Sequence, residues 1–202
     1  INTLQSRARL TLRAVRASPW GELLSRRLQR WSPEGTHYAV EHMFCNLVAA
    51  CRILPHRVVF STLRIIANGV ATSRRFQEVS SDCHMYGAIQ SDCLEHYIHC
   101  EVITIFVVRF FPYIGIKFGP VLGTQRTMLC TDLPQHELVA TVVANDLLVT
   151  TLSTLALGDQ SLAPSLILSG RLRALVRQSA TIRSALGGFD SPMTASQQEA
   201  GA

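Results

Sequence analysis

Residues 83–100 follow the spacing of a small metal-binding hairpin in which one ligand is missing. Cys83, His96 and Cys100 occupy three of the four positions of a C-x3-C-x8-H-x3-C pattern, and Gly87 stands where the second cysteine belongs. In such a hairpin, a zinc knuckle, a tight turn presents two thiolates and a short helix presents His and Cys to one Zn²⁺ ion. The spacing therefore predicts a turn followed by a short helix, with three ligands in place.

The surviving residues of this pattern define the candidate metal ligands. His96 and Cys100 are four residues apart, which places them on one face of a helix. Gly87 supplies turn flexibility but no donor atom. Cys93 can replace the missing ligand only if the helix begins after it, because a continuous helix separates Cys93 from Cys100 by roughly 10 Å. We therefore expect Zn²⁺ binding to be lost or weak, with Cys83, His96 and Cys100 as ligands; a complete four-coordinate site is the alternative.

Positive charge is concentrated in the N-terminal part of the chain. The formal net charge is +5, yet residues 1–76 hold twelve arginines against three glutamates, so the remainder is net negative. All but one of the 19 basic residues are arginine, which suits bidentate contacts to phosphate. This pattern predicts contact with an RNA or DNA backbone; a GC-rich genome is the alternative source of the arginines.

Apolar residues recur at helical spacing in the first third of the chain. The pattern predicts helices at about residues 20–31, 36–54 and 57–68, separated by proline and glycine, with a left-handed stop at Asn68–Gly69. The residues expected to face inward in the second and third helices are Val40, Phe44, Leu47, Val48, Cys51, Val59, Leu63 and Ile66.

The second half of the chain is more apolar. Residues 102–111 can form either a strand or a helix, and the glycines and prolines of 118–134 indicate a loop. The apolar stretch 137–157 is long enough to span a bilayer, but the central Asp146 would cost about 2.5 to 3.5 kcal/mol there. We expect a core helix, and a membrane span is the alternative. A last helix at 165–186 is expected to expose Arg171, Arg173, Arg177 and Arg183.

These patterns predict a mostly α fold, a small helical bundle with a degenerate zinc-knuckle hairpin inserted. The expected organisation is a basic helical region at 1–80, the hairpin at 81–101, an apolar helical region at 102–189 and a disordered tail at 190–202. The chain begins at Ile1 rather than Met, which suggests a fragment of a longer protein.

The cysteines and the missing catalytic motifs limit the functions that this chain can have. The 6 cysteines show no disulfide framework and no leader opens the chain, so we expect an intracellular protein, nuclear or cytoplasmic. Cys45 and Cys51 follow an apolar helical pattern and are expected to be buried. Paired polymerase aspartates, HExxH, GxSxG and P-loop patterns are missing from these residues, which predicts a chain that is not an enzyme and takes no small-molecule substrate.

The segment around the hairpin resembles a known family. Residues 64–76 carry an R-x-x-x-N-G-x-x-T-S-R-R-F motif, and residues 92–100 carry a D-x-L-E-H-Y-x-x-C motif, with Cys83 between them. This combination resembles the region just after the polymerase in non-LTR retrotransposon reverse transcriptases; the likeness spans about 20–110 and is specific over 64–100. The matching residues are Arg64, Asn68, Gly69, Thr72, Ser73, Arg74, Arg75, Phe76, Cys83, Asp92, Leu94, Glu95, His96, Tyr97 and Cys100.

The resemblance implies that this region holds template RNA or target DNA for a polymerase. The candidate nucleic-acid-binding residues are Arg64, Thr72, Ser73, Arg74 and Arg75, whose hydroxyl and guanidinium groups can converge on phosphates without base specificity. A helix cap with solvated arginines is the simpler alternative for these five residues.

Two positions depart from the family pattern. Gly87 replaces the second cysteine, and Val70 stands where relatives often carry an aromatic residue. Three other functions therefore stay open: a decayed remnant without function, a membrane protein, and a helical scaffold that binds another protein. Nucleic-acid binding is distinguished from scaffold binding by its steep dependence on salt.

Overall fold

The computed structural model confirms a mostly helical chain arranged as a small bundle, and the residues it describes form no strand. The structure describes residues 22, 23, 26, 28, 29, 40–70, 72, 82–87, 89, 92–110, 120–156 and 163–186. The expected helix at 20–31 falls largely outside these residues, and the expected tail at 190–202 falls outside them entirely.

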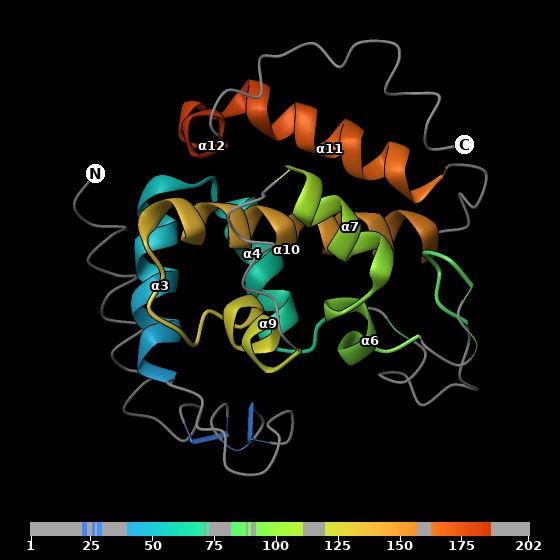
Figure 1. Cartoon of the computed structure of the whole chain (residues 1–202). Helices are drawn as coiled ribbons and strands as arrows, with labels where there is room; N and C mark the ends of the chain where they lie inside the picture. Colours follow the sequence, from blue (N-terminus) through green and yellow to red (C-terminus); the bar gives the residue numbers. More distant parts are fainter. Residues whose placement is uncertain are drawn as a thin grey trace.

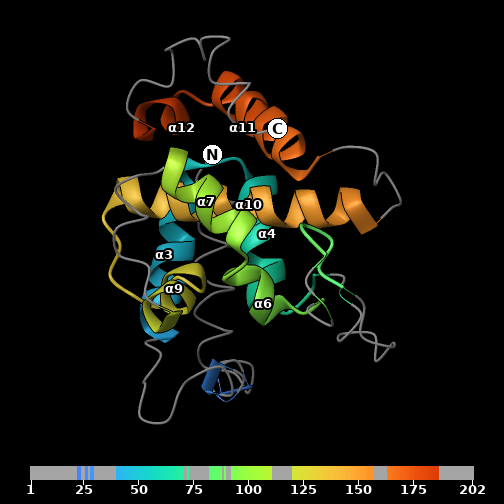
Figure 2. The same cartoon turned by 45° about the vertical axis from the view of Figure 1, so that its right-hand side comes forward.

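A long central helix organises the bundle. α10 (Gln135–Ala156) crosses the molecule, with α11 (Pro164–Gln178) and α12 (Ala180–Ala185) on one side of it (Figure 1). α3 (Val40–Ile53) and α4 (His56–Ile66) pack against α10 from another side, and α4 extends away from α11 in both views (Figures 1 and 2).

Of the other labelled helices, α6 (Leu94–Ile98) and α9 (Pro120–Thr127) lie on the side of α10 away from α12, whereas α7 (Glu101–Phe110) crosses in front of α10 toward α11 (Figures 1 and 2). α6 contacts α9, whereas α7 reaches α11. The apolar stretch that begins at residue 102, which the sequence allowed as either a strand or a helix, lies in the helix α7.

α10 is a core helix, as its sequence predicts. It is the one helix in the described part of the chain with the length and hydropathy to cross a membrane, and 78% of its most apolar stretch is buried by the rest of the protein. A helix that is apolar on every face has to be buried among other parts of the protein. Its two central polar residues are bonded: Asp146 accepts from Ser61 at 2.7 Å, and Asn145 donates to Thr62 and to the carbonyl of Thr127.

The bonding of Asp146 corrects one prediction. Arg171 was expected to be an exposed residue of the last helix, but its guanidinium binds the Asp146 carboxylate at 2.8 Å and its side chain is only 23% exposed. The expected single helix is also two helices. Ser179 separates α11 from α12, and its hydroxyl accepts from the amide of Ile182, which caps α12.

α4 buries two of its three predicted inward residues. Val59 and Ile66 are buried as predicted, but Leu63 is 40% exposed. The reason is that Ser61 and Thr62 bond to the polar centre of α10, and this turns Leu63 toward solvent. In α3 the prediction of buried thiols is wrong for Cys45, which is exposed, and Cys51 is half-buried.

The end of α4 confirms the predicted left-handed stop. Asn68 has φ = 50°, and the amide of Gly69 donates to the carbonyl of Arg64 while the amide of Asn68 donates to the carbonyl of Ile65. This pair of bonds is the Schellman arrangement, which satisfies carbonyls that the helix end would leave unpaired.

The loop prediction for 118–134 is wrong over α9. Pro120 occupies the first position of this helix, where proline costs little, and long-range bonds hold its far end. Arg126 forms a buried ion pair with Glu137, and Asn46 of α3 donates to the carbonyls of Leu129 and Thr131. None of these partners is visible in the local pattern that indicated a loop.

Candidate metal centre

The donor atoms of Cys83, His96 and Cys100 lie within 4.8 Å of one another. Cys83 lies in the turn of residues 82–87, His96 lies in α6, and Cys100 lies between α6 and α7. The structure thus brings together the three residues that the spacing selects, and this group could hold a metal ion. The group offers the two thiols and one imidazole that suit Zn²⁺ or a similar ion.

The turn that presents Cys83 is built around Gly87. The amide of Gly87 donates to the carbonyl of Cys83 at 2.8 Å, and Gly87 has φ = 76°, a left-handed conformation that favours glycine. Within the turn, the amide of Met85 points at the Cys83 sulfur at 3.4 Å.

The helix that presents His96 is shorter than the sequence suggests. α6 begins after Cys93, which is its extended N-cap residue, and ends at Ile98. The backbone breaks at His99 before α7 begins at Glu101, so His96 and Cys100 do not share one continuous helix. Because α6 starts after Cys93, the condition for Cys93 as a replacement ligand is met, yet Cys93 is not part of the donor group.

Burial sets the chemistry of the donors. The Nε2 atom of His96 is buried and has no hydrogen-bond partner among the described residues, and burial lowers the pKa of this imidazole, so it is neutral near pH 7. A neutral imidazole with an unpaired buried nitrogen is the form that binds metals. Burial raises the pKa of Cys100 to about 11, and the amides of Ile103 and Val102, which donate to its sulfur, partly oppose that rise.

A polar network next to the donors joins the turn to α6. The Tyr97 hydroxyl donates to the Asp92 carboxylate at 2.8 Å and accepts from the backbone amide of His84 at 3.1 Å. Tyr97 is completely buried, and burial raises the pKa of its hydroxyl far above the ordinary value. The ligand spacing of residues 83–100 assigned no role to Asp92 or Tyr97, although both belong to the D-x-L-E-H-Y-x-x-C motif.

The surface beside the metal group is open at the turn. Gly87 is exposed, and a β-carbon built on it would meet no atom of the described residues within 4 Å. The ring of Tyr86, itself about half exposed, lies 5.6 Å from the His96 ring. The position of the missing cysteine is therefore accessible rather than filled by another side chain.

The predicted nucleic-acid-binding residues are only partly described. Arg64 donates to the carbonyl of Gly69 at 3.3 Å, which is the simpler helix-cap role. Thr72 is 4% exposed, so its hydroxyl does not lie at the surface. Ser73, Arg74 and Arg75 lie outside the described residues, and their role stays a prediction.

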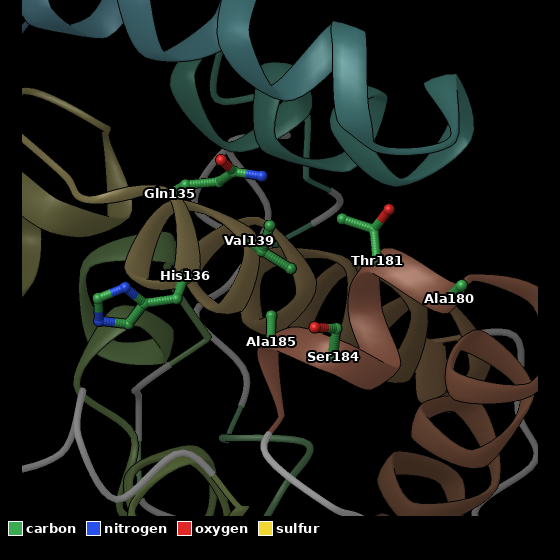
Figure 3. A pocket seen from close by; sticks show the side chains of 7 residues that line it. All are labelled: Gln135, His136, Val139, Ala180, Thr181, Ser184 and Ala185. Atoms are coloured by element: carbon green, nitrogen blue, oxygen red, sulfur yellow. The ribbon is translucent and has the colours of Figure 1, made fainter.

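A recess with a volume of about 550 Å³ lies between the start of α10 and α12 (Figure 3). Its lining contains no cysteine, carboxylate, lysine or arginine, and the His136 ring extends away from α12. The recess lacks the convergent polar groups that distinguish a binding site.

Comparison with family models, with curated proteins and with solved structures finds no match for this chain. The function therefore has to be argued from the residues and the geometry of this molecule.

Proposed function

We propose that this chain is a non-catalytic nucleic-acid-binding module, in which a helical bundle carries a metal-binding hairpin beside arginine-rich segments. The observation that carries the proposal is the convergence of Cys83, His96 and Cys100, with His96 Nε2 buried and unpaired among the described residues. This group lies in the segment that resembles the region after the polymerase of retrotransposon reverse transcriptases. The resemblance implies that the hairpin clamps single-stranded nucleic acid.

Zn²⁺ is the metal that suits this hairpin best. Thiolate sulfur and imidazole nitrogen are its preferred protein ligands, and small hairpins of this type use it to hold a turn against a helix. With three protein ligands instead of four, we expect weaker binding than in a complete knuckle. When bound, Zn²⁺ would fix the turn against α6 through Cys83, His96 and Cys100.

Exposed arginines provide further support. Arg52 at the end of α3, Arg57 at the start of α4 and Arg109 at the end of α7 are all exposed. Guanidinium groups bind phosphate bidentately, and such contacts need no base specificity. Together with Arg74 and Arg75, which follow α4 in the sequence, they supply the positive charge that backbone binding requires.

The test is fluorescence-anisotropy binding of single-stranded RNA at two salt concentrations. The parent chain should bind more weakly at the higher salt, because each phosphate contact releases counterions. Replacing Arg74 and Arg75 with Gln should weaken binding and lower the salt slope by about one unit for each phosphate that the variant no longer neutralises. Arg64 is left unchanged because it bonds to the end of α4.

The matched control replaces Arg173 and Arg177 with Gln. These two residues are exposed on α11, which lies across α10 from α6 (Figure 1), and the change in charge is identical. The control should bind RNA like the parent. Equal losses in both variants would mean a general charge effect, and binding that ignores salt would favour a protein-binding scaffold.

A further inference from the structure

The metal group has three protein donors, whereas ions that prefer sulfur and nitrogen ligands in proteins are usually four-coordinate. Where only three protein ligands are present, the fourth position is open to water or to another molecule. The question for this hairpin is whether a neighbouring side chain closes that position.

Three polar side chains of the hairpin are engaged elsewhere. The Tyr97 hydroxyl and the Asp92 carboxylate bond to each other, and the imidazole of His84 lies 3.8 Å from that same carboxylate. Cys93 caps the start of α6 and is outside the donor group. The described surroundings thus provide no obvious fourth protein ligand.

The turn leaves room for a donor from outside the chain. Gly87 is exposed and carries no side chain, and no atom from the described part of the chain lies within 4 Å of the place a β-carbon would occupy. In the four-ligand pattern this position supplies a thiolate. Because Gly87 carries no side chain, a fourth donor placed here would displace none.

We propose that Cys83, His96 and Cys100 form an open three-ligand site for a thiophilic divalent ion, whose fourth position takes a small exogenous thiolate. Water occupies that position when no thiol is present. The inference rests on the proposed metal-binding role of the hairpin and adds to it a ligand that a complete knuckle excludes. Coordination transfers no electrons: the thiol gives up its proton to solvent, and its sulfur replaces the bound water.

The test uses Co²⁺ as the probe, with the full chain kept reduced by a phosphine. One equivalent of Co²⁺ should give sulfur-to-metal charge-transfer bands of a site with two thiolates. Adding 2-mercaptoethanol should raise those bands in a saturable way to the intensity of three thiolates. In Gly87→Cys the higher intensity should be present from the start, with no response to added thiol.

Gly87→Ala is the matched control for the turn. It imposes the same unfavourable side chain at positive φ but adds no ligand, so it should respond to thiol as the parent does. Cys83→Ser should lose one thiolate contribution, whereas Cys45→Ser, at an exposed thiol outside the group, should leave the spectrum unchanged.

Three outcomes would overturn the proposal. Bands that ignore the thiol would mean that the fourth position does not take it, and a drop by one thiolate contribution in Cys93→Ser would identify Cys93 as the fourth ligand. Bands that vanish on adding thiol would mean that the thiol removes the ion instead of joining it. Failure of the parent to bind Co²⁺ would also end the metal-binding part of the proposed function, whereas the first two outcomes leave that part intact.

Discussion

The centre of α10 and the hairpin of residues 83–100 place polar groups in opposite situations. In α10, Asn145 and Asp146 are buried and bonded to partners on α4, α11 and α9. In the hairpin, His96 Nε2 is buried without a partner among the described residues. Asn145 and Asp146 thus have their partners within the protein, whereas His96 belongs to a group that could hold a metal ion.

The two regions also differ in how much structure supports them. α10 has 22 residues surrounded by other helices, whereas α6 has 5 residues, too few to be stable alone. The hairpin relies on the burial of Leu94 and Tyr97 and on the bonds of Tyr97. We therefore expect a metal-independent bundle that carries a metal-dependent hairpin.

The largest effect is expected at the polar centre of the bundle. Replacing Asp146 with Ala removes the partner of Arg171 and of Ser61, and breaking a buried ion pair in this way costs about 3 to 5 kcal/mol. Urea unfolding would measure the loss. Arg173→Ala, at an exposed position on the same helix as Arg171, should change stability little. A small effect of Asp146→Ala would mean that the network does not hold the bundle together.

A smaller loss is expected where α3 meets the end of α9. Asn46 donates to the carbonyls of Leu129 and Thr131 at 3.0 and 2.8 Å, and Leu129 has φ = 58°. Asn46→Ala should cost about 1 to 3 kcal/mol, because it leaves buried carbonyls unpaired. Urea unfolding of this variant and of the exposed neighbour Cys45→Ala would separate loss of the bonds from a general effect on α3.

The hairpin itself is tested by Tyr97→Phe, which keeps the ring but removes the hydroxyl between Asp92 and the amide of His84. We expect the free energy of unfolding to fall by about 1 to 2 kcal/mol. The metal affinity should be about tenfold lower, because the turn is held less firmly next to the donors. Co²⁺ titration measures the affinity. An unchanged affinity would show that the network does not position the donors.

The smallest predicted effect is a fall in the stability of the fold at alkaline pH. Burial raises the pKa of Cys130 to about 12, from an ordinary value of 9.0. A raised pKa in the folded state contributes stability that is fully present below the unfolded value and is lost as pH rises from about 9 toward 12. The chain should therefore be less stable near pH 10 than near pH 8, and Cys130→Ala should reduce that difference. An identical difference in both proteins would contradict this assignment.

The sequence predicted the parts of this molecule that depend on local spacing. The stop at Asn68, the core position of α10 and the meeting of Cys83, His96 and Cys100 all follow from patterns within a few turns of chain. The predictions failed where distant contacts decide: Leu63 is exposed because α4 turns its polar residues to α10, and α9 is held by Asn46 and Glu137.

The hydrogen bonds of Tyr97 beside the metal group show the same limit of prediction from sequence. Asp92 and Tyr97 stood in a motif, but their bonds to each other and to His84 depend on how the turn folds back onto α6. Likewise, the spacing identified Gly87 as a missing ligand, whereas its positive φ and open surroundings needed the structure.

The most direct test of the difference between bundle and hairpin is native-state hydrogen exchange with Zn²⁺ and with a chelator. We predict that Zn²⁺ slows exchange of the amides in residues 83–100 and leaves those of α10 unchanged. In Cys83→Ser the hairpin amides should exchange alike under both conditions. Exchange in the parent hairpin that ignores Zn²⁺, or a bundle that loses its protection with the chelator, would contradict the account.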